Sequence, residues 1–242
     1  MGIMLNKINK GRKDSKSTVQ LNKTRNETVK PIQEERTRAK EDGKFPAETK
    51  KKTYFILGDS QARNVGNHIA NIHNNVESSF RSYVGPGADM TRVIDCGLKS
   101  WREELVQKEE NQLVIFAGTI DCCHPLQWKT IEQSLYKLKQ ISEKNHVTII
   151  LVPYSINNRY LNTNAYELNR YIWNFFKHVK NVSMIDTNNV INNHKFYKYD
   201  QYHLNELGRQ ILARKIYDVI EQNIAYSHDP DIMPHSSVSN LY

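Results

Sequence analysis

Residues 54–60 read Tyr-Phe-Ile-Leu-Gly-Asp-Ser, a run of apolar side chains that ends at a glycine, an acid and a serine. A short apolar run bounded by turn formers is typical of a strand that is buried in a parallel sheet. After the serine, Val65, Ile69 and Ile72 recur at intervals of three and four residues, which indicates a helix with one buried face. Ser60 is therefore predicted to lie at a strand-to-helix turn.

The same alternation of apolar runs and helical periods continues along the chain. Further strands are expected at 80–84, 112–117, 147–152 and 182–185, and helices at about 61–73, 89–98, 126–143, 162–178 and 204–224. Strands that alternate with helices predict a parallel sheet covered on both faces, because right-handed crossovers place the helices there. The expected fold class is α/β, a three-layer flavodoxin-like sandwich around a five-stranded parallel sheet.

Composition separates a single expected domain, residues 53–224, from two polar flanks. Residues 1–52 contain 15 Lys or Arg and 7 Asp or Glu, which accounts for the whole formal net charge of +8. That segment has one aromatic residue, Phe45, and no apolar period, so we expect a disordered basic arm. It is either an arm that binds nucleic acid or another polyanion, or a solvated linker. Residues 225–242 are expected to form a disordered tail.

Localisation and metal content are predicted from what the sequence lacks. The N-terminus has no apolar stretch of the kind found in signal peptides, and no apolar run approaches the roughly 18 residues of a membrane span. Cys96, Cys122 and Cys123 lack metal-ligand spacing and are odd in number, so free thiols and no metal site are expected. An intracellular protein, cytoplasmic or nuclear, is therefore predicted.

The candidate reactive residues follow the ends of expected strands, which meet at one edge of a parallel sheet. A serine hydroxyl becomes a nucleophile when a base removes its proton and a third group orients that base. Asp200 and His203 precede the last expected helix, and a carboxylate three residues before a histidine can reach its ring. Ser60, His203 and Asp200 are therefore candidates for nucleophile, base and orienting acid.

Attack by a serine also requires donors for the negative charge that develops on the carbonyl oxygen. Backbone N–H groups at turns after strands can supply them, and Ser60 and Gly87 are the candidates for this oxyanion hole. The alternative for Gly58, Gly87 and Gly118 is an ordinary role in turns.

These blocks resemble those of the SGNH (GDSL) hydrolase superfamily. Residues 55–60 resemble its first block, residues 85–88 its glycine block, and residues 200–208 its final D-x-x-H block. The resemblance implies a serine ester hydrolase that acts on a small or short-chain acyl ester without a metal or cofactor. The wider pattern is also similar to esterase-like domains encoded in some animal retroelements, where they accompany nucleic-acid-binding segments.

The third block departs from the family pattern. It reads Gly118-Thr119-Ile120-Asp121, where the family usually has Gly-x-Asn-Asp and the Asn side chain donates to the oxyanion. Ile120 cannot donate, and loss of one such donor commonly lowers turnover by about 10² to 10³. The hydroxyl of Thr119 and a neighbouring backbone N–H are candidate substitute donors. Two functions therefore remain open: an ester hydrolase, and a weak or inactive module of the same fold that binds nucleic acid or a protein partner, with residues 1–52 contributing.

Other residues are expected around the same strand ends. The possible rim of the site comprises Asp59, Gly118, Thr119, Ile120, Asp121 and Tyr154. The residues after the fourth strand either line a pocket for the acyl or leaving group or form a solvated loop: Tyr154, Asn157, Asn158 and Arg159.

Overall fold

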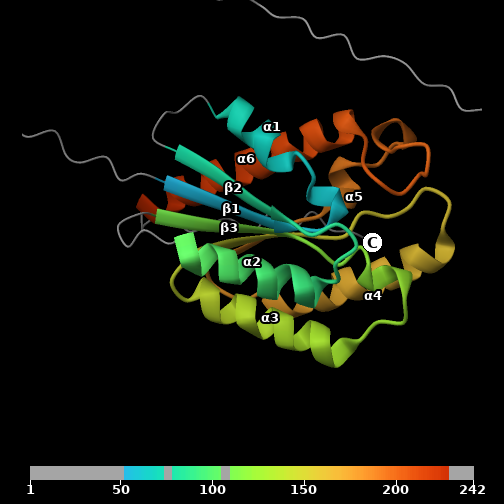
Figure 1. The fold of residues 1–242 in the computed structure, drawn as a ribbon, viewed down its shortest axis with the longest axis horizontal. Helices are drawn as coiled ribbons and strands as arrows, with labels where there is room; N and C mark the ends of the chain where they lie inside the picture. The colour runs from blue at the N-terminus through green and yellow to red at the C-terminus, as the bar shows by residue number, and fades with distance from the viewer. Residues whose placement is uncertain (1–51, 74–77, 105–109, 229–242) are drawn as a thin grey trace, which may run out of the picture. The chain divides into compact units, whose positions relative to one another are not determined.

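The computed structural model describes residues 52–73, 78–104 and 110–228. Its five strands form one parallel sheet in the order β2-β1-β3-β4-β5 (Figure 1). The strands are β1 (Lys52–Gly58), β2 (Ser78–Val84), β3 (Glu110–Phe116), β4 (His146–Ile150) and β5 (Val182–Ile185). The predicted five-stranded parallel sheet is confirmed. The basic arm, apart from Lys52, and the tail from residue 229 onward lie outside the described residues.

Helices cover both faces of this sheet, as Figure 1 shows. On one face lie α2 (Met90–Glu104), α3 (Trp128–Ser142) and α4 (Arg159–Phe176), which pack on the sheet through one apolar cluster. On the other lie α1 (Val65–Ile72), α5 (Thr187–Val190) and α6 (Glu206–His228), which share a second cluster. The two clusters confirm the three-layer α/β sandwich.

Strand β1 supplies side chains to both apolar clusters. Phe55 and Leu57 point to the α2 side, whereas Tyr54 and Ile56 point to the α1 side, as the alternation of side chains along a strand requires. All four are at most 5% exposed. The continuous apolar run before Gly58 is therefore explained by a central strand that is covered on both faces.

The helix expected at 61–73 is divided in two. Ser60–Ala62 forms a short 3-10 helix, η1, and α1 begins only at Val65. Between them, Asn64 adopts a left-handed conformation with φ of 64°, which interrupts the helical hydrogen bonding. The four-residue helix α5 was not expected from the sequence, and α6 ends at His228 instead of residue 224. Within the described ranges, no helix combines the length and apolar character needed to cross a membrane.

The strand order reverses where β1 and β3 lie side by side, which makes this point the topological switch point of the sheet. The chain leaves β1 for β2 on one side and later returns to β3 on the other, so the loops that follow β1 and β3 diverge. Ligands of open α/β sheets bind beyond the carboxyl ends of strands at such a switch point. Ser60 follows β1 and Ile120 lies in the loop after β3.

Gly58 permits the close approach of η1 to β3. A Cβ atom at this position would lie 2.2 Å from Ala62 Cβ and 2.8 Å from the carbonyl oxygen of Phe116. We expect Gly58→Ala to lower the free energy of unfolding by about 3 kcal/mol, because both neighbours must shift. Gly87→Ala is the control: no atom lies within 4 Å of its Cβ position, so only its φ of 73° opposes the change, at a cost of about 1 kcal/mol. Urea unfolding measures both, and equal losses would contradict the steric explanation.

Candidate active site

Ser60 lies directly beyond the carboxyl end of β1, as the first residue of η1. Asp59 fixes this turn, since its N–H donates to the carbonyl of Phe116 at 3.0 Å and its Oδ1 accepts the N–H of Gln61 at 2.9 Å. The carboxylate thus caps η1. Ser60 itself is half-buried.

The second oxygen of the same carboxylate joins the ends of two strands. Asp59 Oδ2 accepts the N–H of Thr119, beyond β3, at 3.1 Å. Asp59 is fully buried, and this burial raises the pKa of its carboxyl, although the hydrogen bonds from Gln61 and Thr119 act in the opposite direction. The structure therefore places Asp59 beneath Ser60 and away from any exposed rim.

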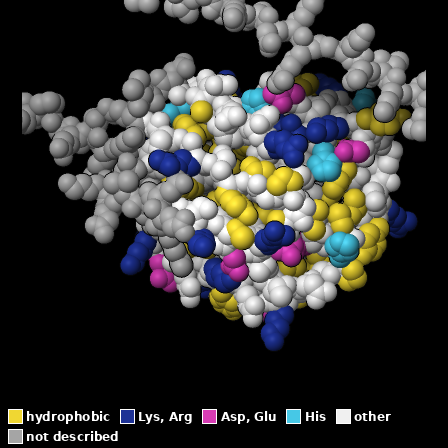
Figure 2. Space-filling model, viewed as in Figure 1, with side chains coloured by type: hydrophobic (Ala, Val, Ile, Leu, Met, Phe, Trp, Pro, Cys, Tyr) yellow, Lys and Arg dark blue, Asp and Glu magenta, His cyan; other side chains and the backbone are white. Residues whose placement is uncertain are grey.

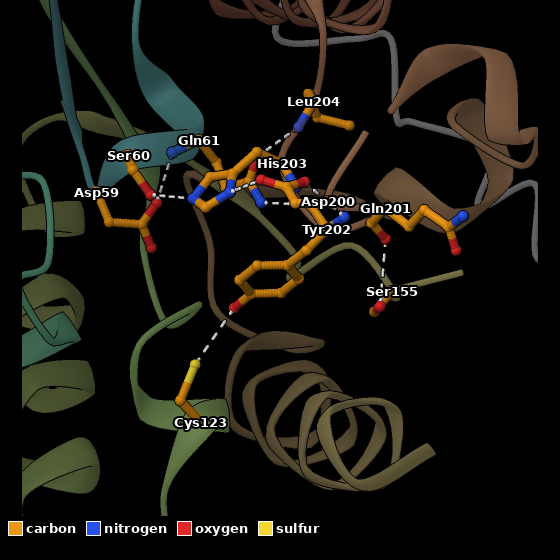
Figure 3. Close-up of polar contacts among 10 residues, drawn as sticks. All are labelled: Asp59, Ser60, Gln61, Cys123, Ser155, Asp200, Gln201, Tyr202, His203 and Leu204. Atoms are coloured by element: carbon orange, nitrogen blue, oxygen red, sulfur yellow. Dashed lines mark hydrogen bonds and ion pairs between the residues drawn. The ribbon is translucent and has the colours of Figure 1, made fainter. Parts of the chain in front are cut away.

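His203 and Asp200 lie on the loop between the 3-10 helix η3 (His194–Phe196) and α6. Asp200 Oδ2 is 2.8 Å from His203 Nδ1, and His203 Nε2 is 3.1 Å from Ser60 Oγ (Figure 3). An ionised carboxylate can only accept, so Nδ1 carries the proton of the neutral ring and Nε2 accepts from the serine hydroxyl. Three residues chosen from the sequence thus form one hydrogen-bonded chain.

The loop itself keeps Asp200 ionised. Asp200 Oδ1 accepts the backbone N–H groups of Tyr202 at 3.0 Å and His203 at 2.9 Å. Partial burial acts to raise the pKa of Asp200, but these two bonds and the imidazole outweigh it, and the pKa is lowered below its ordinary value. The Asp200 side chain is 48% exposed and that of His203 33%, so this end of the chain faces solvent.

Tyr202 anchors the loop that contains Asp200 and His203 to the loop that follows β3. Its hydroxyl donates to the carbonyl of Thr119 at 2.7 Å and lies 3.7 Å from Cys123 Sγ. Burial of this hydroxyl raises its pKa, so it remains a donor. Figure 3 shows the ring of Tyr202 beneath the imidazole of His203, between the triad and Cys123.

Gln201 joins the loop that contains Asp200 and His203 to the segment that follows β4. Its carbonyl accepts the N–H of Ile156 at 3.0 Å and the hydroxyl of Ser155 at 3.2 Å, and its side chain bonds to that of Asn157. Gln201 also has a positive φ of 57°. The two bonds to its carbonyl fix the point at which the chain turns from Asp200 toward His203.

Gly87 lies in a loop that is tied to the Ser60 side of the sheet. Gly85 N–H donates to the carbonyl of Gly58 at 2.8 Å, and the N–H of Met90 donates to Asp121 Oδ2 at 2.8 Å. Gly87 lies between these two anchors, is exposed, and has a φ of 73° that glycine adopts without strain. Its place is compatible with the role expected for it, which stays a prediction.

The loop after β3 contains the residues that depart from the family pattern. Ile120 is half-buried and precedes the 3-10 helix η2 (Asp121–Cys123). Thr119 is fully buried, and its N–H donates to Asp59, so this N–H is not free to replace the missing donor. Asp121 caps the start of α2, and burial raises the pKa of its carboxyl.

Gly118 and the cysteines complete the placement of the residues selected from the sequence. Gly118 has a φ of 117°, and a Cβ there would lie 2.9 Å from Leu168 and 3.0 Å from Val152. The thiols of Cys96, Cys122 and Cys123 are free. Across 52–73, 78–104 and 110–228, no three His, Cys, Asp or Glu side chains are grouped as metal ligands.

An open pocket of about 520 Å³ adjoins the loop of Asp200 and His203 on the α4 side. Its wall includes Ile156 and Asn157, which bond to Gln201, and the four residues named from the sequence for a pocket all line it. Asn162 holds this wall in shape, since its side chain accepts the N–H of Ser155 at 2.7 Å and donates to its carbonyl at 2.8 Å. The lining residues are Tyr154, Ile156, Asn157, Asn158, Arg159, Asn162, Thr163 and Tyr166.

Two residues that contact the triad were not found by sequence reasoning. Tyr202 bonds to a residue 83 positions away, and Gln61 bonds to the loop of His203 across more than 140 positions. The glutamine next to the serine and the tyrosine next to the histidine carried no signal of their own. Only their adjacency to the candidate nucleophile and base could have drawn attention to them.

Comparison with known proteins identifies the fold. No family model and no curated protein matches the sequence. Among solved structures, a lipolytic protein of the G-D-S-L family from Veillonella parvula shares 20% identity over 70% of this chain and 98% of its own, with a TM-score of 0.59. A lipase/acylhydrolase from Enterococcus faecalis shares 21% over 71% and 96%, with a TM-score of 0.55. A carbohydrate esterase of family 3 from Talaromyces cellulolyticus shares 14% over 72% and 98%, with a TM-score of 0.57. The described domain therefore has the fold of GDSL-type hydrolases.

The two carboxyls, Asp59 and Asp200, should give opposite pH dependences of stability. Asp59 has a raised pKa when folded, so its stabilising contribution is present at low pH and is lost as pH rises above 3.8 and through the folded pKa. Asp200 has a lowered pKa when folded, so its contribution is present above 3.8 and is lost as pH falls through the folded pKa. As pH rises from about 4 to 7, Asp59→Asn should gain stability relative to wild type. The stability deficit of Asp200→Asn should stay nearly constant over that range and should shrink as pH falls below 3.8. Urea unfolding from about pH 2 to 7 measures both, and a change in the same pH window for the two variants would contradict the assignment.

Proposed function

We propose that this chain is a serine ester hydrolase that acts on a small or short-chain acyl ester. The observation that carries the proposal is the hydrogen-bonded chain from Ser60 through His203 to Asp200, with distances of 3.1 and 2.8 Å. A serine, a neutral imidazole and an ionised carboxylate in this order are the groups that acyl transfer needs. These three hydrogen-bonded side chains also lie at the carboxyl edge of the sheet, at the switch point between β1 and β3.

The proposed reaction uses each of these groups twice. Ser60 Oγ attacks the ester carbonyl while His203 Nε2 takes the hydroxyl proton, and the imidazolium then returns this proton to the departing alcohol. Water next attacks the acyl-serine, again losing a proton to His203, which returns it to Ser60 Oγ as the acid leaves. Asp200 holds Nδ1–H and stabilises the imidazolium in both halves. The N–H groups of Ser60 and Gly87 receive the negative charge on the carbonyl oxygen.

The shared fold and the adjoining cavity support an ester as substrate. The solved structures with this fold include proteins described as a lipase/acylhydrolase and a carbohydrate esterase. The cavity is within the usual size range of small-ligand sites, and its wall is bonded to Gln201, directly after Asp200. We propose that it receives one side of the ester, with the rings of Tyr154 and Tyr166 as its apolar walls.

Removal of the nucleophile tests the proposal directly. Ser60→Ala is expected to reduce p-nitrophenyl acetate hydrolysis by at least about 10³-fold, because no other group on the described surface completes the chain to His203. Ser100→Ala is the matched control, since this serine is also half-buried, lies on α2 and bonds to the carbonyl of Cys96. A Ser60→Ala rate equal to that of wild type would rule the triad out.

Ile120 provides a second test, by gain of activity. Ile120→Asn supplies an amide donor at the place where the third family block has one, so we expect kcat to rise by about 10²-fold. Ile120→Val is the control, because it shortens the side chain without adding a donor. Initial rates with p-nitrophenyl acetate at saturating concentration measure both variants. No gain with Asn would mean that the existing donors already suffice, or that position 120 does not face the oxyanion.

The same residue favours a second candidate function, a binding module without catalytic activity. Ile120 removes a donor, and an inactive domain would tolerate this loss. The basic residues that would bind nucleic acid are in residues 1–52, nearly all of them outside the described residues, and Figure 2 shows basic and acidic side chains interspersed on the face of the domain that it presents. Hydrolysis no greater in wild type than in Ser60→Ala would favour this second function.

A further inference from the structure

Gln61 follows the candidate nucleophile and is fully buried. Its side chain makes two hydrogen bonds, and both reach the backbone beside His203. Gln61 Nε2 donates to the carbonyl of Tyr202 at 3.0 Å, and Gln61 Oε1 accepts the N–H of Leu204 at 3.0 Å (Figure 3). The side-chain amide of Gln61 is therefore bonded to the backbone of the residues immediately before and after His203.

These bonds supply a constraint that the catalytic loop lacks by itself. The bonds from Asp200 orient the imidazole within the loop, but they do not fix the loop relative to Ser60. Tyr202 ties the loop to Thr119, at the end of β3. Gln61 ties it to the turn that carries the nucleophile, and that turn is itself held by the bond from Gln61 N–H to Asp59.

We propose that Gln61 is a positioning residue that sets the distance between Ser60 Oγ and His203 Nε2. The proposal rests on the proposed function for its catalytic consequence. Both the NH2 group and the carbonyl oxygen of the side-chain amide are needed, because the carbonyl of Tyr202 is an acceptor and the N–H of Leu204 is a donor. No ionised or apolar side chain of similar length satisfies both, and an error of about 1 Å in the placement of a base can reduce the rate by about 10².

Gln61→Met tests this role, because methionine has similar length and makes neither bond. We expect kcat for p-nitrophenyl acetate to fall by about 10²-fold while KM changes by less than about threefold, since the ester itself does not contact Gln61. Gln61→Glu retains the acceptor for Leu204, but it loses the donor and places a buried carboxylate oxygen against the carbonyl of Tyr202, so a fall of about 10²-fold or more is expected in a folded protein.

Asn169→Leu is the matched control for the loss of a buried amide. Asn169 is also buried and makes two bonds to one segment of backbone, to the N–H and the carbonyl of Val152 at 2.8 and 2.9 Å, but none to the catalytic loop. Both substitutions should lower the melting temperature, and only those at Gln61 should lower kcat when assayed well below it. If Gln61→Met is folded and retains kcat within threefold of Asn169→Leu, the proposal is wrong.

An NMR measurement separates this proposal from the proposed function. Ser60→Ala should shift the ring resonances of His203, because Nε2 loses its contact with Oγ. In a Gln61→Met background the same Ser60→Ala change should produce little shift, since the contact is already loosened. This result without any esterase activity would uphold the positioning role and reject the hydrolase. Equal shifts in both backgrounds would reject the positioning role whether or not esters are hydrolysed.

Discussion

The carboxylate of Asp59 holds the loops after β1 and β3 together, and the site depends on this contact. One oxygen bonds to Gln61 in the turn after β1, and the other bonds to Thr119 after β3. Because the group is fully buried, burial alone favours its neutral form, and the two N–H groups offset part of the cost of the ionised form. Asp59 was expected at the rim of the site, but it is buried at its base. There its two hydrogen bonds fix the turn in which the chain leaves β1, and with it the position of Ser60.

The remaining contacts extend from these two strand ends toward the C-terminal loop. The carbonyl of Thr119 accepts a hydrogen bond from the hydroxyl of Tyr202. The side chain of Gln61 donates to the carbonyl of Tyr202 and accepts the N–H of Leu204. His203 is therefore positioned from both strand ends at once, although it belongs to neither. Thr119 follows β3 and Gln61 lies in the turn after β1, so the placement of His203 relative to Ser60 depends on the β1–β3 register. Side-chain packing around the imidazole has less influence, because His203 is partly exposed.

The sequence predicted the sheet from local signals, and it predicted that Ser60, Asp200 and His203 would come together from the meeting of strand ends and from the family resemblance. Apolar runs such as 54–57 mark buried strands, and Asp200 and His203 lie three residues apart in one loop. It did not predict the division of the first helix at Asn64, because a left-handed asparagine resembles any polar helix residue in the sequence. Gln61 and Tyr202 could not be assigned either, since their roles depend on partners 83 to 141 residues away. The solved structures that share this fold do not include retroelement domains, so the similarity to such domains stays a prediction.

Two charges form in the proposed transition state, and the site stabilises the positive one better than the negative one. The positive charge on His203 meets Asp200, which has a lowered pKa and holds the ring in the correct tautomer. The negative charge on the carbonyl oxygen would meet the N–H groups expected from the sequence, those of Ser60 and Gly87, while the side chain of Ile120 offers no donor and the N–H of Thr119 is bonded to Asp59. Proton transfer is therefore well supported, whereas stabilisation of the oxyanion is weak. A substrate whose leaving group departs easily needs less stabilisation of the oxyanion. Activated esters should therefore be the substrates on which such a site is least impaired.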